Sequence, residues 1–150
     1  MTGDAPPDNP TERTAWVGTW SAAPQLIDAA NLPPAPGLAH NTLRQIVYVS
    51  IGGSRLRVRF SNAFGDGPVT LQAVHVARAA GNSGVDARSD RALAFWGSAL
   101  VTIPAGATVT SDPLDFALAP QTQIAVTAAF GATPRGVTGH PGSRCTSYLG

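Results

Sequence analysis

A strictly alternating stretch limits the possible folds of this chain more than any other feature. Leu56, Val58 and Phe60 alternate with three arginines over residues 55–60. Because successive side chains of a β-strand point to opposite faces, this stretch predicts a strand with one apolar face and one arginine face. Such a strand belongs to a sheet that has a core on one side and water or a partner on the other.

Further short apolar runs follow along the chain, separated by glycine and proline. We expect a first strand in residues 15–22, and a second in residues 42–51 that the turn at residues 52–53 joins to the alternating stretch. Another strand should begin at Val69, five short ones should lie between residues 92 and 130, and a closing one within residues 143–149. The chain has one Glu and no Lys, so strong helix formers are scarce. We therefore predict an all-β fold, an antiparallel β-sandwich of jelly-roll type with about eight to ten strands.

Two segments fall outside this pattern. Residues 1–14 are polar and proline-rich, with too little apolar surface to offset the entropy of ordering, so a flexible leader is expected there. Residues 26–41 contain Pro33, Pro34 and Pro36, which predict a long irregular loop. The remaining residues, 15–150, are expected to form one domain.

Composition excludes several classes of function. The formal net charge is +1, which gives no broad field to attract nucleic acid. No stretch of about 18 apolar residues is available to cross a membrane. The lone Cys145 has no partner within the chain for a disulfide. We therefore predict neither a nucleic-acid partner nor a membrane span.

No residue pattern predicts a catalytic centre. There is no Gly-x-Ser-x-Gly elbow, and Gly67 stands where a Gly-Asp-Ser block over residues 65–67 would carry the hydroxyl. His40, His75 and His140 lie far apart and outside any metal-ligand spacing, so no metal and no cofactor is predicted. We expect no catalytic residue, and no serine hydroxyl hydrogen-bonded to an imidazole inside a pocket.

Three other side chains are candidate binding residues. Trp20 ends the first expected strand, where an indole is the readiest of the three tryptophans to be exposed. His140 and Arg144 lie in a loop rich in Gly and Pro, of the kind that presents polar and aromatic groups to ligands. His75, in the middle of a strand, is expected to be half-buried and hydrogen-bonded instead. The arginine face is expected to be solvated and paired with Asp on neighbouring strands.

The order and spacing of several segments resemble a known family. The segments are WVGTWSAAPQ from Trp16, TLRQ from Thr42, GGSRLRVRFSNAFG from Gly52, PVTL from Pro68, IPAG from Ile103 and SDP from Ser111. Together they resemble the N-terminal accessory β-domain of bacterial GDSL-type esterases of the SGNH hydrolase superfamily, over residues 15–150. The resemblance implies a secreted or periplasmic protein, and an α/β catalytic domain whose Gly-Asp-Ser, Gly-x-Asn-Asp and Asp-x-x-His blocks do not occur in this chain.

By this resemblance, the domain would pack against the hydrolase domain and shape its ester entrance through Trp20, His140 and Arg144. Two other interpretations remain open. A free-standing carbohydrate-binding module would stack sugars on exposed indoles, and an assembly domain would use sheet edges or the arginine face. Two or more indoles in one open groove would favour the sugar ligand, whereas an apolar patch flanked by His140 and Arg144 would favour a catalytic partner.

Overall fold

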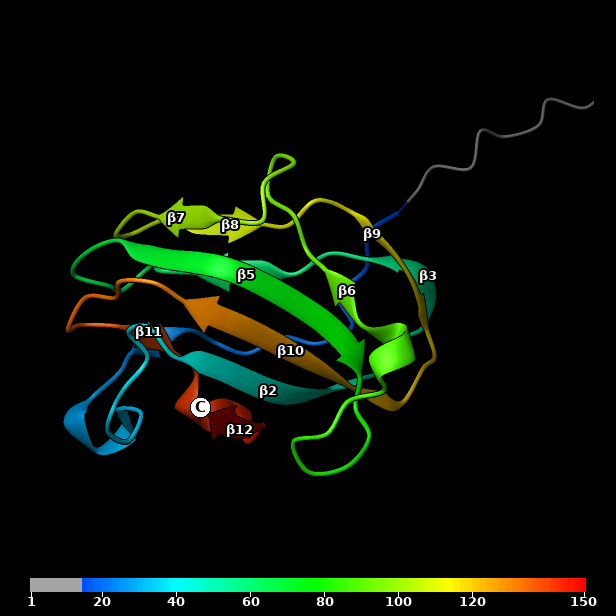
Figure 1. Cartoon of the computed structure of the whole chain (residues 1–150), viewed down its shortest axis with the longest axis horizontal. Coiled ribbons are helices and arrows are strands. Elements are labelled where there is room, and N and C mark those ends of the chain that lie inside the picture. Colours follow the sequence, from blue (N-terminus) through cyan, green and yellow to red (C-terminus); the bar gives the residue numbers. More distant parts are fainter. Residues whose placement is uncertain (1–14) are drawn as a thin grey trace, which may run out of the picture.

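The computed structural model describes residues 15–150, so the leader expected in residues 1–14 lies outside the described residues. Strands dominate this part of the chain, and the only helices in it are three single 3-10 turns (Figure 1). The predicted all-β class is confirmed. The strands are β1 (Gln25–Leu26), β2 (Thr42–Val49), β3 (Gly53–Leu56), β4 (Arg59–Ser61), β5 (Val69–Arg78), β6 (Arg91–Ala92), β7 (Val101–Ile103), β8 (Thr108–Thr110), β9 (Leu114–Leu118), β10 (Thr122–Phe130), β11 (Thr138–Gly139) and β12 (Thr146–Leu149). The 3-10 turns are η1 (Ala29–Asn31), η2 (Ala87–Ser89) and η3 (Pro141–Ser143).

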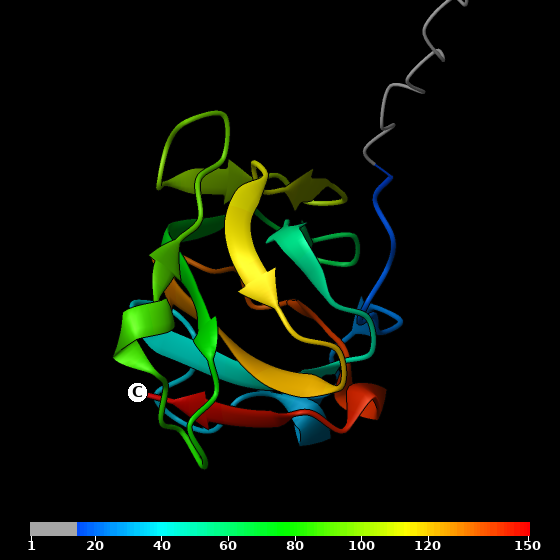
Figure 2. The ribbon, with the colours of Figure 1, turned by 90° about the vertical axis from the view of Figure 1, so that its right-hand side faces the viewer.

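These strands build a two-layer antiparallel sandwich. One layer is a broad sheet in the order β12-β2-β10-β5-β6, with β7 also paired to β5. The facing layer consists of two short ladders, β3 with β9 and β4 with β8. Figure 2 shows the broad sheet below and to the left, with β3, β8 and β9 above it. The described strands number twelve, more than expected, because β1, β6 and β11 are two-residue ladders that no alternation marks.

The apolar face of the alternating strands forms the core between the layers. Leu71, Val74 and Val76 of β5 are each at most 1% exposed, and the register places Val76 opposite Val126 of β10. The ring of Phe95 packs edge to face against the ring of Phe60 from the other layer, with ring centroids 6.0 Å apart. The predicted alternation therefore sets which side chains meet in the core.

Four local predictions are wrong. The run at residues 92–97 is not a strand, because β6 ends at Ala92 and a turn at residues 95–98 follows. Residues 15–22 form no strand; Thr19 is attached to the end of β2 by hydrogen bonds to Ser50 and Ile51 instead. The turn at residues 52–53 makes no hairpin, because β2 pairs with β10 and β12 while β3 pairs with β9. The alternating stretch is split between β3 and β4, and in the gap Val58 bonds to Ser111 through both its N–H and its carbonyl. The irregular loop expected over residues 26–41 is present; β1 ends at Leu26, and η1 is the only element after it within this range.

Among residues 15–150, no helix has the length and apolar character that a bilayer span requires.

The arginine face is solvated and partly paired, as predicted. Arg55 forms an exposed ion pair with Asp115 of β9, with Nε 3.2 Å from Oδ1. The guanidinium of Arg57 lies 4.4 Å above the ring of Trp16.

Candidate functional site

The candidate site is a pocket of about 200 Å³ beside β2, at the point where β12 begins. β12 pairs with β2 only between Leu43 and Ile46, so β12 leaves the edge of β2 uncovered from Val47 onward. The segment that contains Trp20 and the η3 turn meet at this uncovered edge. The lining residues are Trp20, Ile46, Tyr48, Gln123, Ser143, Arg144, Cys145 and Thr146.

The structure brings the three predicted binding residues together here. Trp20 and Arg144 line the pocket, although they lie near opposite ends of the chain. The imidazole of His140 packs edge to face on the indole of Trp20, with ring centroids 5.5 Å apart. Trp20 is half-buried and also contacts the core. The expectation that Trp20 is the most exposed indole is therefore wrong, because its partners are η3 and the core, which no local pattern reveals.

A second expectation about this site is also wrong. His140 Nδ1 lies 2.9 Å from Ser143 Oγ, so a serine hydroxyl is hydrogen-bonded to an imidazole at the edge of a pocket. The contact arises because η3 folds Ser143 back onto the residue that precedes the turn. The Ser143 hydroxyl also lies 3.2 Å from Cys145 Sγ and accepts from the Cys145 N–H at 3.4 Å. The three side chains form a compact polar cluster.

This cluster lacks the carboxylate that orients the imidazole in a serine-hydrolase centre. Within residues 15–150, no carboxylate hydrogen-bonds to His140, so nothing fixes the imidazole as a base. The Ser143 oxygen is held by the Cys145 backbone N–H within its own turn, which is the role of a turn-capping hydroxyl. The cluster therefore offers a hydroxyl, a thiol and an imidazole for contact, without the oriented acid and base of acyl transfer.

Sequence reasoning missed several residues of the pocket. Tyr48 is 55% exposed on the outward face of β2, and Ile46 lies on the same face. Their parity, opposite to that of Val47 and Val49, was the available signal. Arg144 itself has φ +56°, a left-handed conformation that is costly for an arginine and turns the chain from η3 toward β12.

His75 and two aspartates away from the pocket have structural partners. His75 is half-buried, with Nδ1 2.8 Å from Asp90 Oδ2, which confirms the prediction for this residue. Asp86 caps η2. Asp112 accepts from the backbone N–H groups of Trp96 and Gly97. No group of three or more His, Cys, Asp or Glu side chains within the described residues is arranged to hold a metal ion.

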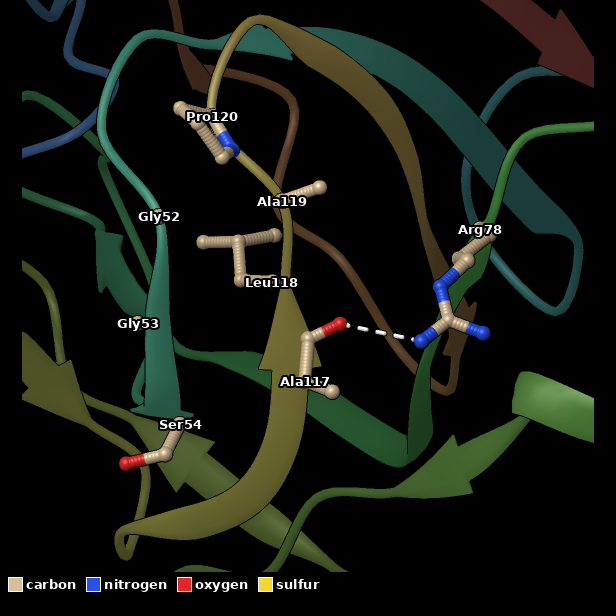
Figure 3. A pocket seen from close by; sticks show the side chains of 8 residues that line it. All are labelled: Gly52, Gly53, Ser54, Arg78, Ala117, Leu118, Ala119 and Pro120. Carbon is tan, nitrogen blue, oxygen red and sulfur yellow. Dashed lines mark hydrogen bonds between the residues drawn. The ribbon is translucent and has the colours of Figure 1, made fainter.

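A larger hollow of about 590 Å³ lies elsewhere, between the start of β3 and the end of β9 (Figure 3). It is open and mostly apolar, and its charged side chain is Arg78. The Arg78 guanidinium donates to the carbonyl of Ala117 at 3.0 Å. Without an imidazole, carboxylate or thiol in its lining, this hollow offers no acid–base chemistry.

No protein-family model matches this chain, and no curated protein matches it significantly.

Proposed function

We propose that this chain is the non-catalytic β-sandwich domain of a secreted or periplasmic SGNH-type serine esterase. In this proposal the β2-edge pocket docks against the hydrolase domain and shapes the entrance for the ester substrate. The supporting observation is that Trp20, His140 and Arg144 meet at one pocket. All three belong to the segments that carry the resemblance to this family or to the loop that closes it.

The composition of the pocket suits a protein partner. It combines an exposed tyrosine, an arginine and a tryptophan, the side chains that most often anchor protein interfaces. β12 begins at the pocket and ends at Leu149, three residues further along the strand, which is about 10 Å. A domain attached after Gly150 would start beside this pocket.

The carbohydrate alternative has less support from the arrangement of the indoles. Trp16 stacks under Arg57 and Trp20 packs on His140, while Trp96 projects from the loop between β6 and β7. Neither hollow described above is lined by more than one tryptophan. The shared groove that would favour a sugar ligand is therefore not formed by these residues.

The first test compares this chain with the protein extended along its reading frame beyond Gly150. The extended protein should carry a Gly-Asp-Ser block and hydrolyse p-nitrophenyl acetate. Residues 1–150 alone should hydrolyse it no faster than free imidazole at equal concentration. A stop codon with no GDSL-type hydrolase encoded beside it, or hydrolysis by residues 1–150 that Ser143→Ala abolishes, would contradict the proposal.

The second test probes the docking pocket. Arg144→Glu and Tyr48→Ser should weaken association between residues 1–150 and the separately produced hydrolase domain by about tenfold or more, because interface anchors contribute 1–3 kcal/mol or so. Arg88→Glu, a charge reversal on exposed η2, is the matched control and should leave the affinity unchanged. Equal losses in Arg144→Glu and Arg88→Glu, with no loss in the neutral variant Tyr48→Ser, would show that net charge, not this pocket, drives association.

A further inference from the structure

The loop between β6 and β7 displays an apolar tip that no other residue within 15–150 covers. Trp96 is 82% exposed and Leu100 is 54% exposed, whereas the neighbouring Phe95 is 1% exposed. The five consecutive residues 96–100, WGSAL, are all exposed and none is charged. Tryptophan has the largest apolar surface of any side chain, so an indole exposed to solvent on an uncharged loop tip is unusual.

The backbone holds this indole outward at an energetic cost. Residues 95–98 form a two-residue turn in which Phe95 and Ser98 exchange both backbone hydrogen bonds, at 2.8 and 3.0 Å. Trp96 has φ +49° and Gly97 has φ +81°. Both central positions of such a turn favour Gly or Asn, and a bulky residue there is a conformational outlier. Backbone outliers of this kind point to a functional role for the residue that carries them.

A carboxylate from the opposite layer fixes the turn. Asp112 accepts from the Trp96 N–H at 3.0 Å through Oδ1 and from the Gly97 N–H at 2.8 Å through Oδ2. The Leu100 N–H is also bonded, to Ser98 Oγ at 3.2 Å. Together with the Phe95 and Ser98 pair, five of the six N–H groups from residue 95 to residue 100 have acceptors within the protein.

These features select among possible partners. A sugar or a polar peptide would be recognised by free donors and acceptors around the indole, and here five of the six backbone donors of the loop are already used. A segment that enters a lipid layer needs the opposite, an apolar tip whose own polar groups are satisfied internally. Tryptophan in particular prefers the interface between lipid headgroups and acyl chains.

We propose that the β6–β7 loop is a lipid-contact loop that inserts Trp96 and Leu100 into the surface of a bilayer with little net charge. The loop and the pocket lie on opposite sides of the sandwich: in both views the loop is at the top, and β12 is at the bottom (Figures 1 and 2). The contact with lipid is thus spatially separate from the pocket. It is also independent of the esterase assignment, because it uses none of the pocket residues.

The test is co-sedimentation of the chain with sucrose-loaded phosphatidylcholine vesicles. Trp96→Ser and Leu100→Ser should each reduce the bound fraction, and Trp96→Ser should lower the partition coefficient about tenfold or more, because most of its apolar surface is lost. Leu26→Ser is the matched control, because Leu26 is 55% exposed on β1, away from the loop, and this variant should bind like the wild type. Circular dichroism on each variant verifies folding.

Salt separates insertion from charge attraction. Raising NaCl from about 0.1 M to about 1 M shortens the Debye length from about 10 Å to about 3 Å and should leave binding unchanged. The proposal is overturned if the wild type does not bind the vesicles, or if Trp96→Ser binds as well as the wild type. If the chain binds only to anionic vesicles and salt abolishes this binding, the contact belongs to arginines. If the chain binds insoluble cellulose through Trp96 and does not bind vesicles, the loop recognises sugar.

Discussion

Replacing Trp96 by Asn should not destabilise the protein, although tryptophan is the largest side chain in the sequence. Because Trp96 is 82% exposed, only about a fifth of it is covered. At about 25 cal/mol per Å² and roughly 200 Å² per side chain, this covered part contributes about 1 kcal/mol. The left-handed conformation at φ +49° costs a bulky residue about 1–2 kcal/mol, whereas Asn adopts it readily. The balance predicts a gain of about 0 to 1 kcal/mol for Trp96→Asn.

Gly97→Ala provides the contrast within the same turn. A Cβ at Gly97 would have no atom within 4 Å, so its effect comes only from φ +81° and should be a loss of about 1 kcal/mol. Urea unfolding followed by far-UV circular dichroism measures both variants without depending on Trp96 fluorescence. A loss of more than about 1 kcal/mol in Trp96→Asn, with an unchanged m-value, would refute the argument that this indole serves contact and not folding.

Three further variants probe the sandwich and the pocket. Gly65→Ala would place a Cβ 1.9 Å from Asn62 Oδ1 and displace the Asn62 amide, which donates to two backbone carbonyls. We expect the free energy of unfolding in urea to fall by about 2–4 kcal/mol. The control Gly18→Ala, at a position with no atom near the added Cβ, should lower it by less than about 0.5 kcal/mol. Trp20→Ala should lower the unfolding free energy by about 2 kcal/mol, because this indole is half-buried against the core; a neutral effect would mean that it serves only as a binding residue. Asp115→Asn should change the unfolding free energy by less than about 1 kcal/mol, because its ion pair is exposed; a larger loss would show that the β3–β9 ladder depends on it.

Side-chain parity predicted the strands well and their pairing poorly. The period of two is a local property, so β5, β9, β10 and β12 lie within the stretches where alternation or short apolar runs placed them. Pairing is a long-range property. The residues at 52–53 are compatible with a hairpin, but β2 and β3 pair with β10 and β9, whose partner residues lie 58 to 87 positions away along the chain.

The two surface features depend on contacts that the sequence does not mark. The apolar run over residues 92–97 is typical of a strand. The hydrogen bonds between Phe95 and Ser98 and those to the Asp112 carboxylate instead fix a turn that exposes Trp96. Ser143 meets His140 because η3 closes between them, and short 3-10 turns have no reliable sequence signature. The sequence marked Trp20, His140 and Arg144 as candidate binding residues one by one, and no local pattern predicted that they would meet at one pocket.

The two proposed contacts share one feature: each involves a residue with a strained, left-handed backbone conformation. Among residues 15–150, five non-glycine residues have positive φ: His40, Asn82, Trp96, Gln121 and Arg144. Asn and His tolerate this region better than other side chains, so the cost falls mainly on Trp96, Gln121 and Arg144. Gln121 serves the tight turn between β9 and β10. A chain shaped by stability alone would carry Gly or Asn at the other two positions, because either residue relieves the strain. Since Trp96 and Arg144 instead present an indole and a guanidinium at two separate surfaces, the strain at both positions supports the two proposed contacts, with lipid and with a hydrolase domain.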